Sequence, residues 1–440
     1  MLPEPSITIL GADPSHRRCV LNGNAFQQDA ITTFHGWQYA AFYSFLDPTT
    51  PEPLYVHLAR RQLPSGPWET LVFRDYPQTV DDGHNTVQMG ICPGDGSIHL
   101  SYDHHCDAYV CPFPQTNECL TNTTLRLRYR HSIANLALQP SSFDWSPSLF
   151  TPTLNHLPGL SPSHKPFHYV TYPRFISSPH TPSPLATKAN TNNAPSSSSS
   201  PLFLSFRDGK AGLGNDHLYR YSPSPPSSPT TTNSANIGRY TYIGPVLTGI
   251  QSNPYVHGIT ISPLLPSTNP DPDHESRTKI HITWVWRGFV PYEGWDDPLD
   301  TKHKQQAGPN GMENNHDVCY VYCEDGRGEV WRNNQGSVVA DLSMERQDGE
   351  IDGDGSGGGD GDGHGTNGLG QTVRNDSEGI VVWKVGKGMG LMNQEAQAVD
   401  WDGGVHVLNR DWEGEGGRYE WKHYYREPGG ESNVLRVYWA

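Results

Sequence analysis

Lys279-Ile-His-Ile-Thr-Trp-Val-Trp-Arg287 decides the fold class, because an apolar residue stands at every second position from Ile280 to Trp286. This two-residue period is typical of a β-strand. Similar short runs, bounded by Gly, Pro, Asn or Asp, occur at 97–103 (SIHLSYD), 202–207 (LFLSFR), 318–323 and 404–408 (GVHVL). No window longer than about twelve residues carries the 3.6-residue apolar period of a helix. The sequence therefore predicts an all-β fold.

Three of these runs resemble one another: Ser97-Ile-His-Leu, Lys279-Ile-His-Ile and Gly404-Val-His-Val. The first follows Gly96 and the third follows Gly403. A β-propeller produces weak repeats of this kind, since each blade presents similar strands.

Four segments are biased in composition and hold too few apolar residues to order themselves. We predict that they are disordered, low-complexity loop insertions in a single β-propeller domain, residues 1–440: 176–200, 222–237, 262–277 and 341–378. The remaining 345 residues fit seven blades at roughly 50 residues each, although a pair of two-sheet sandwiches also fits. The sequence stops at Val437-Tyr-Trp-Ala440, inside an apparent strand, so we expect an incomplete last blade.

The composition excludes several classes of protein. Aromatic residues make up 10% of the 440 residues, too many for a disordered chain. The net charge of −16 argues against a general nucleic-acid binder, which needs a basic surface. Eight acids and one arginine between Asp341 and Gly363 carry −7 of that charge. No run reaches the roughly 18 apolar residues of a membrane span, so no membrane partner is expected.

The signals for compartment and metal conflict. Seven cysteines, without a CxxC pair, leave at least one thiol free and predict no zinc ribbon. The sequons at Asn122 and Asn375 suit a secreted protein, but the first 20 residues lack the apolar core of a signal peptide. A loop beginning at Asp352 lacks the twelfth-position glutamate of an EF-hand, so a solvated loop is favoured. We expect no organic cofactor, and the sequence assigns no ligands to a structural Ca²⁺ or Zn²⁺ ion.

The densest polar constellation is Asp81-Asp-Gly-His-Asn85, followed by Asp103-His-His105. Two histidines at the ends of neighbouring strands suit either a metal pair or an acid/base pair. Surface histidines are the plain alternative, because the chain has 21 of them. Further along, Tyr172 has an ordinary interpretation as a packing residue. Arg207 has one as a solvated residue at the end of a strand. Cys323–Trp331 (CEDGRGEVW) has the outline of an Asp-box, a structural hairpin turn.

In order, DDGHN, DGSIHLSYDHH, VTYPRF, FLSFRDGKAGLGN, ITWVWRG, NNHDVCYVYCEDG and MNQEAQAVD resemble the BNR-repeat β-propeller polysaccharide lyases, which include ulvan lyases and the fungal L-rhamnose-α-1,4-D-glucuronate lyase. The resemblance runs from about Phe26 to Tyr425. It implies a secreted, monomeric, seven-bladed β-propeller that acts on a uronic-acid-containing polysaccharide by β-elimination. The catalytic residues that it implies are His84, His105, Tyr172 and Arg207. Expected substrate contacts are Asn85, His104, Arg287, Asn393 and Gln394.

Two features depart from the family. The segment 176–200 stretches the spacing between Tyr172 and Arg207. His104 also fits the second histidine, but His105 is favoured because the polar turn follows it.

The residue types suit the chemistry of elimination. The C5 proton of a uronate becomes acidic when its carboxylate is neutralised, and Arg207 can do this with two hydrogen bonds. A base must take that proton and an acid must protonate O4. Tyr172 and His84 can divide these roles, with His105 in support, and the division stays open. A nearby guanidinium is expected to lower the pKa of Tyr172. Either Trp284 or Trp286 is expected to stack on a sugar.

The specific expectation is cleavage of a rhamnosyl-α-1,4-glucuronate linkage to give an unsaturated uronate. Two other functions stay open. The Asp-box outline allows a sialidase-like glycoside hydrolase, although such enzymes need a paired acid and base that the sequence does not supply. A non-catalytic, carbohydrate-binding propeller is the other alternative.

Overall fold

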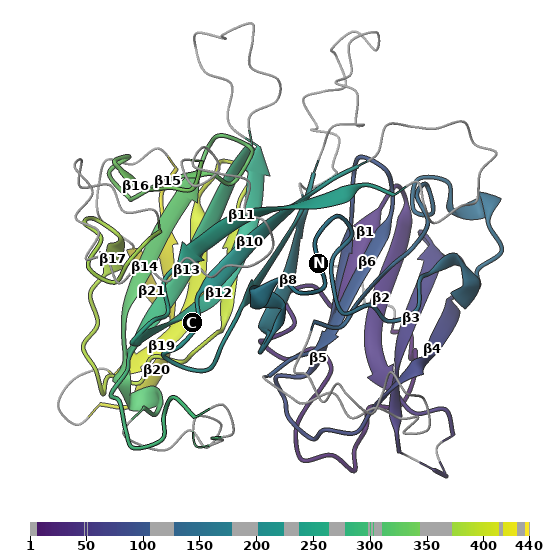
Figure 1. Ribbon diagram of the computed structural model, residues 1–440, viewed down its shortest axis with the longest axis horizontal. Helices are drawn as coiled ribbons and strands as arrows, with labels where there is room; N and C mark the ends of the chain where they lie inside the picture. Colours follow the sequence, from purple (N-terminus) through teal and green to yellow (C-terminus); the bar gives the residue numbers. More distant parts are fainter. Residues whose placement is uncertain are drawn as a thin grey trace, which may run out of the picture.

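Figure 1 shows the protein as a computed structural model. The structure describes residues 7–47, 49–50, 52–105, 127–177, 201–223, 237–263, 278–297, 300, 302, 310–343, 372–412, 417–428 and 436–439. These residues form β-strands, 3₁₀ turns and loops, with no α-helix among them. Accordingly, no helix in this part of the chain is long and apolar enough to cross a membrane.

The described strands form five sheets with antiparallel pairing between neighbouring strands. The first two, in chain order, contain β1 (Ile31–Phe34), β2 (Trp37–Ser44), β3 (Leu54–Gln62) and β4 (Glu69–Gln78), and then β5 (Thr86–Ile91), β6 (Ile98–Asp103) and β7 (Tyr129–His131). The third contains β8 (Thr171–Ser177), β9 (Leu202–Arg207), β10 (Asp216–Ser222) and β11 (Arg239–Leu247).

The last two sheets follow in the same way. The fourth contains β12 (Ser252–Pro263), β13 (Thr278–Gly288), β14 (Asn315–Cys323), β15 (Val330–Arg332), β16 (Val338–Asp341) and β17 (Val381–Trp383). The fifth contains β18 (Ala396–Val399), β19 (Val405–Trp412), β20 (Tyr419–Arg426) and β21 (Arg436–Trp439). Short 3₁₀ turns are η1 (Pro140–Ser142), η2 (Pro147–Leu149), η3 (Lys165–Phe167) and η8 (Met312–Asn314).

Successive sheets pack against one another in chain order. Contacts join β2 to β5, β5 to β8, β8 to β12, and β12 to β18. In Figure 1, β8 stands between the purple and blue strands of the N-terminal sheets and the green and yellow strands of the C-terminal ones. Each sheet is thus one unit of a propeller-type array. The described residues do not give a blade count, so seven blades and an incomplete last blade stay predictions.

The internal repeat of the sequence corresponds to a repeated position in the fold. His99, His281 and His406 lie on β6, β13 and β19, the second strand of three sheets. The His99 Nδ1 atom lies 2.6 Å from the Tyr129 hydroxyl, and that of His281 lies 2.9 Å from the Tyr320 hydroxyl. Each tyrosine comes from the third strand of its sheet. The shared motif therefore holds neighbouring strands together.

The predicted insertions fall mainly on residues 178–200, 224–236, 264–277 and 344–371, outside the described residues. Their described ends belong to the ordered fold. Ile176 is buried in β8, and Asp341 ends β16. Val373 is fully buried and forms a parallel bridge with Leu247. The packed structure thus extends into the 176–200 and 341–378 ranges.

The hairpin between β14 and β15 contains the Asp-box outline. The Asp325 carboxylate accepts the backbone N–H groups of Arg327, Gly328, Glu329 and Val330 at 2.6–3.0 Å. These bonds replace water at donors that a tight turn leaves unpaired. The segment therefore has a structural role, as the sequence predicts.

Candidate functional site

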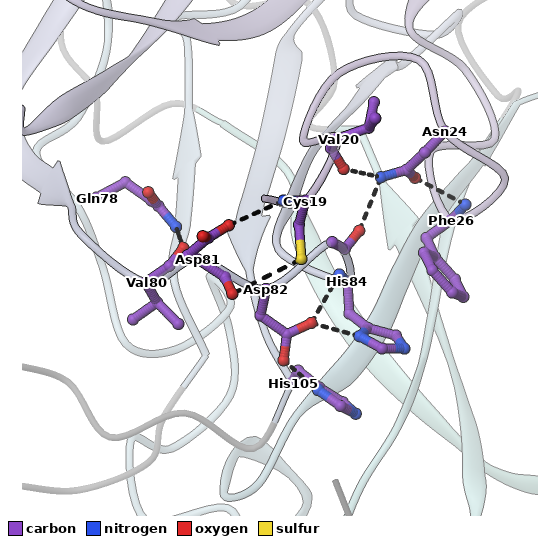
Figure 2. A network of polar contacts seen from close by, with 11 residues as sticks. Cys19, Val20, Asn24, Phe26, Gln78, Val80, Asp81, Asp82, His84 and His105 are labelled. Carbon is purple, nitrogen blue, oxygen red and sulfur yellow. Dashed lines mark hydrogen bonds and ion pairs between the residues drawn. The ribbon is translucent and has the colours of Figure 1, made fainter. Parts of the chain in front are cut away.

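One carboxylate connects the two histidines that the sequence singles out. The Asp82 Oδ2 atom accepts a hydrogen bond from His105 Nδ1 at 2.6 Å, and its Oδ1 atom pairs closely with His84 Nδ1 (Figure 2). The His84 backbone N–H also donates to Oδ1, at 3.0 Å. The two imidazoles stack with their centroids 3.8 Å apart and their planes 22° from parallel. Side chains from a turn before β5 and from the end of β6 thus form one cluster.

Asp82, His84 and His105 are also the three potential metal ligands that lie close together among the described residues, with ligand atoms within 4.8 Å of one another. A metal ion binds best in the plane of each imidazole that coordinates it. Nearly parallel rings 3.8 Å apart do not share such a plane. Hydrogen bonds from each ring to its own carboxylate oxygen fit this geometry better than a shared ion.

Tyr172 lies beside the histidine cluster. Its ring centroid is 5.7 Å from that of His84 and 6.4 Å from that of His105. Its backbone has a φ of 57°, a left-handed conformation that is uncommon for a non-glycine residue. The β8–β9 ladder shifts register between Thr171 and Arg174, so Tyr172 occupies a bulge. Such strained positions are concentrated at functional sites.

The 176–200 insert does not separate Tyr172 from Arg207. Strands β8 and β9 flank the insert and pair antiparallel, with Thr171 directly opposite Arg207. The Arg207 guanidinium carbon lies 5.1 Å from the centroid of the Tyr172 ring. Both side chains are at least 95% buried. The stretched spacing in the sequence is therefore bridged by strand pairing.

A second tyrosine, Tyr255 on β12, stands between two arginines. Arg207 and Arg287 both hydrogen-bond its phenol oxygen, and their guanidinium carbons lie 5.6 and 4.4 Å from its ring centroid. Its ring is 6.3 Å from that of Tyr172. The site therefore places two phenols beside two cations.

The pKa values of the two phenols move in opposite directions. Burial raises the pKa of Tyr255, but Arg287 and Arg207 outweigh it, so the pKa is lowered overall. Burial, together with Tyr255, raises the pKa of Tyr172 far above its usual value, despite the opposing effect of Arg207. Arg207 does act in the expected direction, but the expectation that it leaves the pKa of Tyr172 lowered overall is wrong. Desolvation penalises its phenolate more than the two neighbouring arginines stabilise it.

Arg287 and Asn393, both expected to contact substrate, lie together, with Arg287 beside Tyr255. Arg287 donates to Asn315 Oδ1 at 2.8 Å through Nε and to Asn393 Oδ1 through a terminal nitrogen. Asn315 Nδ2 also donates to Asn393 Oδ1, at 3.0 Å. These amides hold the Arg287 guanidinium next to Tyr255.

The other three expected substrate contacts, His104, Asn85 and Gln394, are all buried. The His104 Nε2 atom accepts a hydrogen bond from the Arg128 backbone N–H at 3.1 Å. The ring of His104 therefore bonds the residue just before β7 and not Asp82. Asn85 is fully buried, and its backbone N–H bonds the Asp82 carbonyl. Gln394 is buried, and its Oε1 has no hydrogen-bond partner in the described part of the chain.

Neither Trp284 nor Trp286 exposes a ring face on which a sugar could stack. Both are 1% exposed or less and belong to the apolar core around β12, β13 and β14. Residues two apart on a strand share a face. The expectation that one of them faces the site is therefore wrong.

An aromatic residue from the N-terminal loop packs over the cluster. The Phe26 ring lies 4.3 Å from the His84 ring and 5.5 Å from the Tyr172 ring, and is visible beside His84 in Figure 2. Asn24 anchors the loop by donating to the Val20 and Gly83 carbonyls, each at 2.7 Å. Phe26 thus fixes one edge of the site.

Sequence reasoning missed Asp82 and Tyr255 as site residues. Asp82 had a usable signal, because an aspartate two residues before His84 can reach its Nδ1 and its backbone N–H. Tyr255 is one of 21 tyrosines and has no distinguishing motif around it. Only the packing of β8 against β12 identifies it.

Comparisons with known proteins agree with this architecture. The model of a BNR repeat-containing family matches residues 37–181 and 194–437. The crystal structure of polysaccharide lyase Uly1 is similar with a TM-score of 0.55 and 15% identity, covering 96% of this chain and 74% of that one. No curated protein matches the chain significantly. The structural likeness confirms the predicted all-β, propeller-type fold, and the family match confirms the resemblance found in the sequence. The chain belongs to the BNR repeat-containing family.

Proposed function

We propose that the protein is a polysaccharide lyase that cleaves at a glucuronate by β-elimination. The observation that carries the proposal is the position of Tyr172, whose ring lies 5.7 Å from that of His84 and 5.1 Å from the Arg207 guanidinium carbon. A proton-transfer group beside a cation is what elimination next to a carboxylate requires. The likeness to polysaccharide lyase Uly1 supports the same reaction class.

Arg207 and Arg287 would bind the uronate carboxylate and stabilise the negative charge that develops as the C5 proton leaves. Because both already hydrogen-bond the Tyr255 phenol, an incoming carboxylate would exchange with or join that contact. Before substrate binds, the phenol oxygen of Tyr255 would hold the two guanidinium groups close together.

The raised pKa of Tyr172 keeps its phenol protonated. A protonated phenol suits the acid that gives its proton to O4 as the bond to the leaving sugar breaks. With Tyr172 as the acid, the base that takes the C5 proton would be the Nε2 atom of His84 or His105. The electron pair of the C5–H bond forms the C4–C5 double bond, so the product is an unsaturated uronate.

The expected substrate is a rhamnosyl-α-1,4-glucuronate polysaccharide. Incubation with a gum-arabic-type and an ulvan-type polysaccharide tests the proposal, because elimination creates an ultraviolet-absorbing product. Absorbance on the first substrate alone supports the rhamnosyl-glucuronate linkage. New reducing ends without absorbance would instead reveal a hydrolase, and neither signal would point to a binding protein.

A further inference from the structure

We propose that Asp82 is a positioning residue that holds both His84 and His105 in the Nδ1–H state and leaves both Nε2 atoms facing away from the carboxylate (Figure 2). The proposal deepens the proposed function and rests on it for its catalytic consequence. It extends the site by a residue that touches neither the expected carboxylate position nor Tyr172 directly.

The hydrogen-bonding chemistry fixes the direction of both contacts. An ionised carboxylate only accepts hydrogen bonds, so an imidazole nitrogen that bonds it must carry a proton. Burial raises the pKa of Asp82, but hydrogen bonds from His105 and His84 lower it far below its usual value, so the group is ionised. Both Nδ1 atoms are therefore donors. In a neutral ring the lone pair is then on Nε2, where it can accept a proton.

The cluster is also held by contacts that do not involve the Asp82 side chain. Asn24 donates to the Gly83 carbonyl at 2.7 Å, which ties the turn to the N-terminal loop. His105 forms a β-bridge with Thr171. A substitution that keeps the size of Asp82 should consequently leave the two histidines in place.

Asp82→Asn is the decisive substitution. The amide has one oxygen that accepts and one nitrogen that donates. Only one imidazole can then keep its Nδ1–H, and the other must turn a bare Nδ1 toward the amide, which moves its proton to Nε2. We expect kcat to fall about 10²–10⁴-fold, as when a carboxylate that orients a catalytic histidine is replaced. KM should stay within a few-fold, because the arginines are unchanged.

Asp81→Asn is the matched control. The neighbouring Asp81 carboxylate accepts the backbone N–H groups of Arg18 and Cys19, each at 3.0 Å, and contacts neither histidine. This variant should keep the wild-type kcat. Thermal melting of both variants checks that each is folded.

Long-range ¹H–¹⁵N spectra of histidine-labelled protein test the tautomers without substrate. Wild-type protein should show Nδ1–H for both His84 and His105, and Asp82→Asn should show Nε2–H for one of them. An Nε2–H tautomer for either ring in the wild type, or a wild-type kcat in Asp82→Asn, would overturn the proposal. If both rings are Nδ1–H but no polysaccharide is cleaved, positioning stands and the proposed function fails.

Discussion

The rings of Tyr172 and Tyr255 lie 6.3 Å apart, yet the pKa of one phenol is raised and that of the other is lowered. Two phenolates this close would repel each other, so only one of the pair takes the charge. The two arginines around Tyr255 make it the more acidic phenol of the pair. The site thus holds two neighbouring phenols of different acidity by placement alone.

Tyr172→Phe should remain folded and lose about 10²–10⁴-fold in kcat, because the ring stays packed while the transferable proton is removed. The appearance of the ultraviolet-absorbing product measures this loss. Tyr55→Phe, on β3 in another sheet, is the control and should be as active as wild type. Near-wild-type activity in Tyr172→Phe would pass both proton transfers to the histidines.

Tyr255→Phe should remove a phenol that ionises at lower pH than an ordinary tyrosine. Because its pKa is lowered in the folded state, the stability that it contributes is present above about pH 10 and is lost as the pH falls through the folded-state pKa. An alkaline titration of tyrosinate absorbance should show one early transition in the wild type. Tyr172→Phe should keep this transition; its loss there would assign the early phenol to Tyr172.

Arg207→Lys should impair catalysis although the charge is kept, since an ammonium cannot make the two-pronged contact with a carboxylate. We expect a loss of about tenfold or more in kcat/KM, corresponding to at least about 1.4 kcal/mol. Arg220→Lys on β10 is the matched control, because its guanidinium faces Glu329 at 3.6 Å instead. Equal activities for the two variants would remove Arg207 from carboxylate binding.

Phe26→Ala should lower kcat about 2–10-fold, because the ring supports both His84 and Tyr172 and aromatic contacts contribute about 0.5–1.5 kcal/mol. Phe26→Tyr should restore most of that loss. Steady-state kinetics on both variants give the measurement. Higher activity in Phe26→Ala would show that the ring obstructs the site.

Gly90→Ala should destabilise the protein by about 1–3 kcal/mol, the usual cost of overpacking. An added Cβ on β5 would lie 2.7 Å from the Cγ atom of Phe175 on β8, where two sheets meet. At Gly386 the nearest atom would be 3.8 Å away, so Gly386→Ala should change stability by less than about 0.5 kcal/mol. Chemical denaturation compares the two; equal midpoints would argue against close contact between these sheets.

Much of the fold could be predicted because strand periodicity is a local property. The run 202–207 coincides with β9, and 279–287 lies within β13. The position of a strand in the array is not local. The contact between β8 and β12 follows from the packing of whole sheets, so nothing around Tyr255 indicates that it meets Tyr172.

In the candidate site too, local motifs could be predicted, whereas properties that depend on the packing of whole sheets could not. His84, His105, Tyr172 and Arg207 are found from motifs, and the structure brings these four together. The direction of the Tyr172 pKa could not be found, since burial is a property of the assembled sheets. His104 and His105 are neighbours in sequence, but the left-handed backbone at His104, with a φ of 88°, turns the two rings to different partners.

The bulge at Tyr172 makes the site sensitive to the number of residues in β8 as well as to their identity. Thr171 faces Arg207, but Arg174 faces Ser205, so three steps along β8 correspond to two along β9. Deleting one residue here would restore regular pairing and remove the bulge that orients Tyr172, while an added residue that shifted the register would send every later side chain of β8 to the opposite face. Insertions and deletions within residues 171–174 should therefore be as damaging as loss of the tyrosine itself, even in a chain that tolerates long inserts nearby.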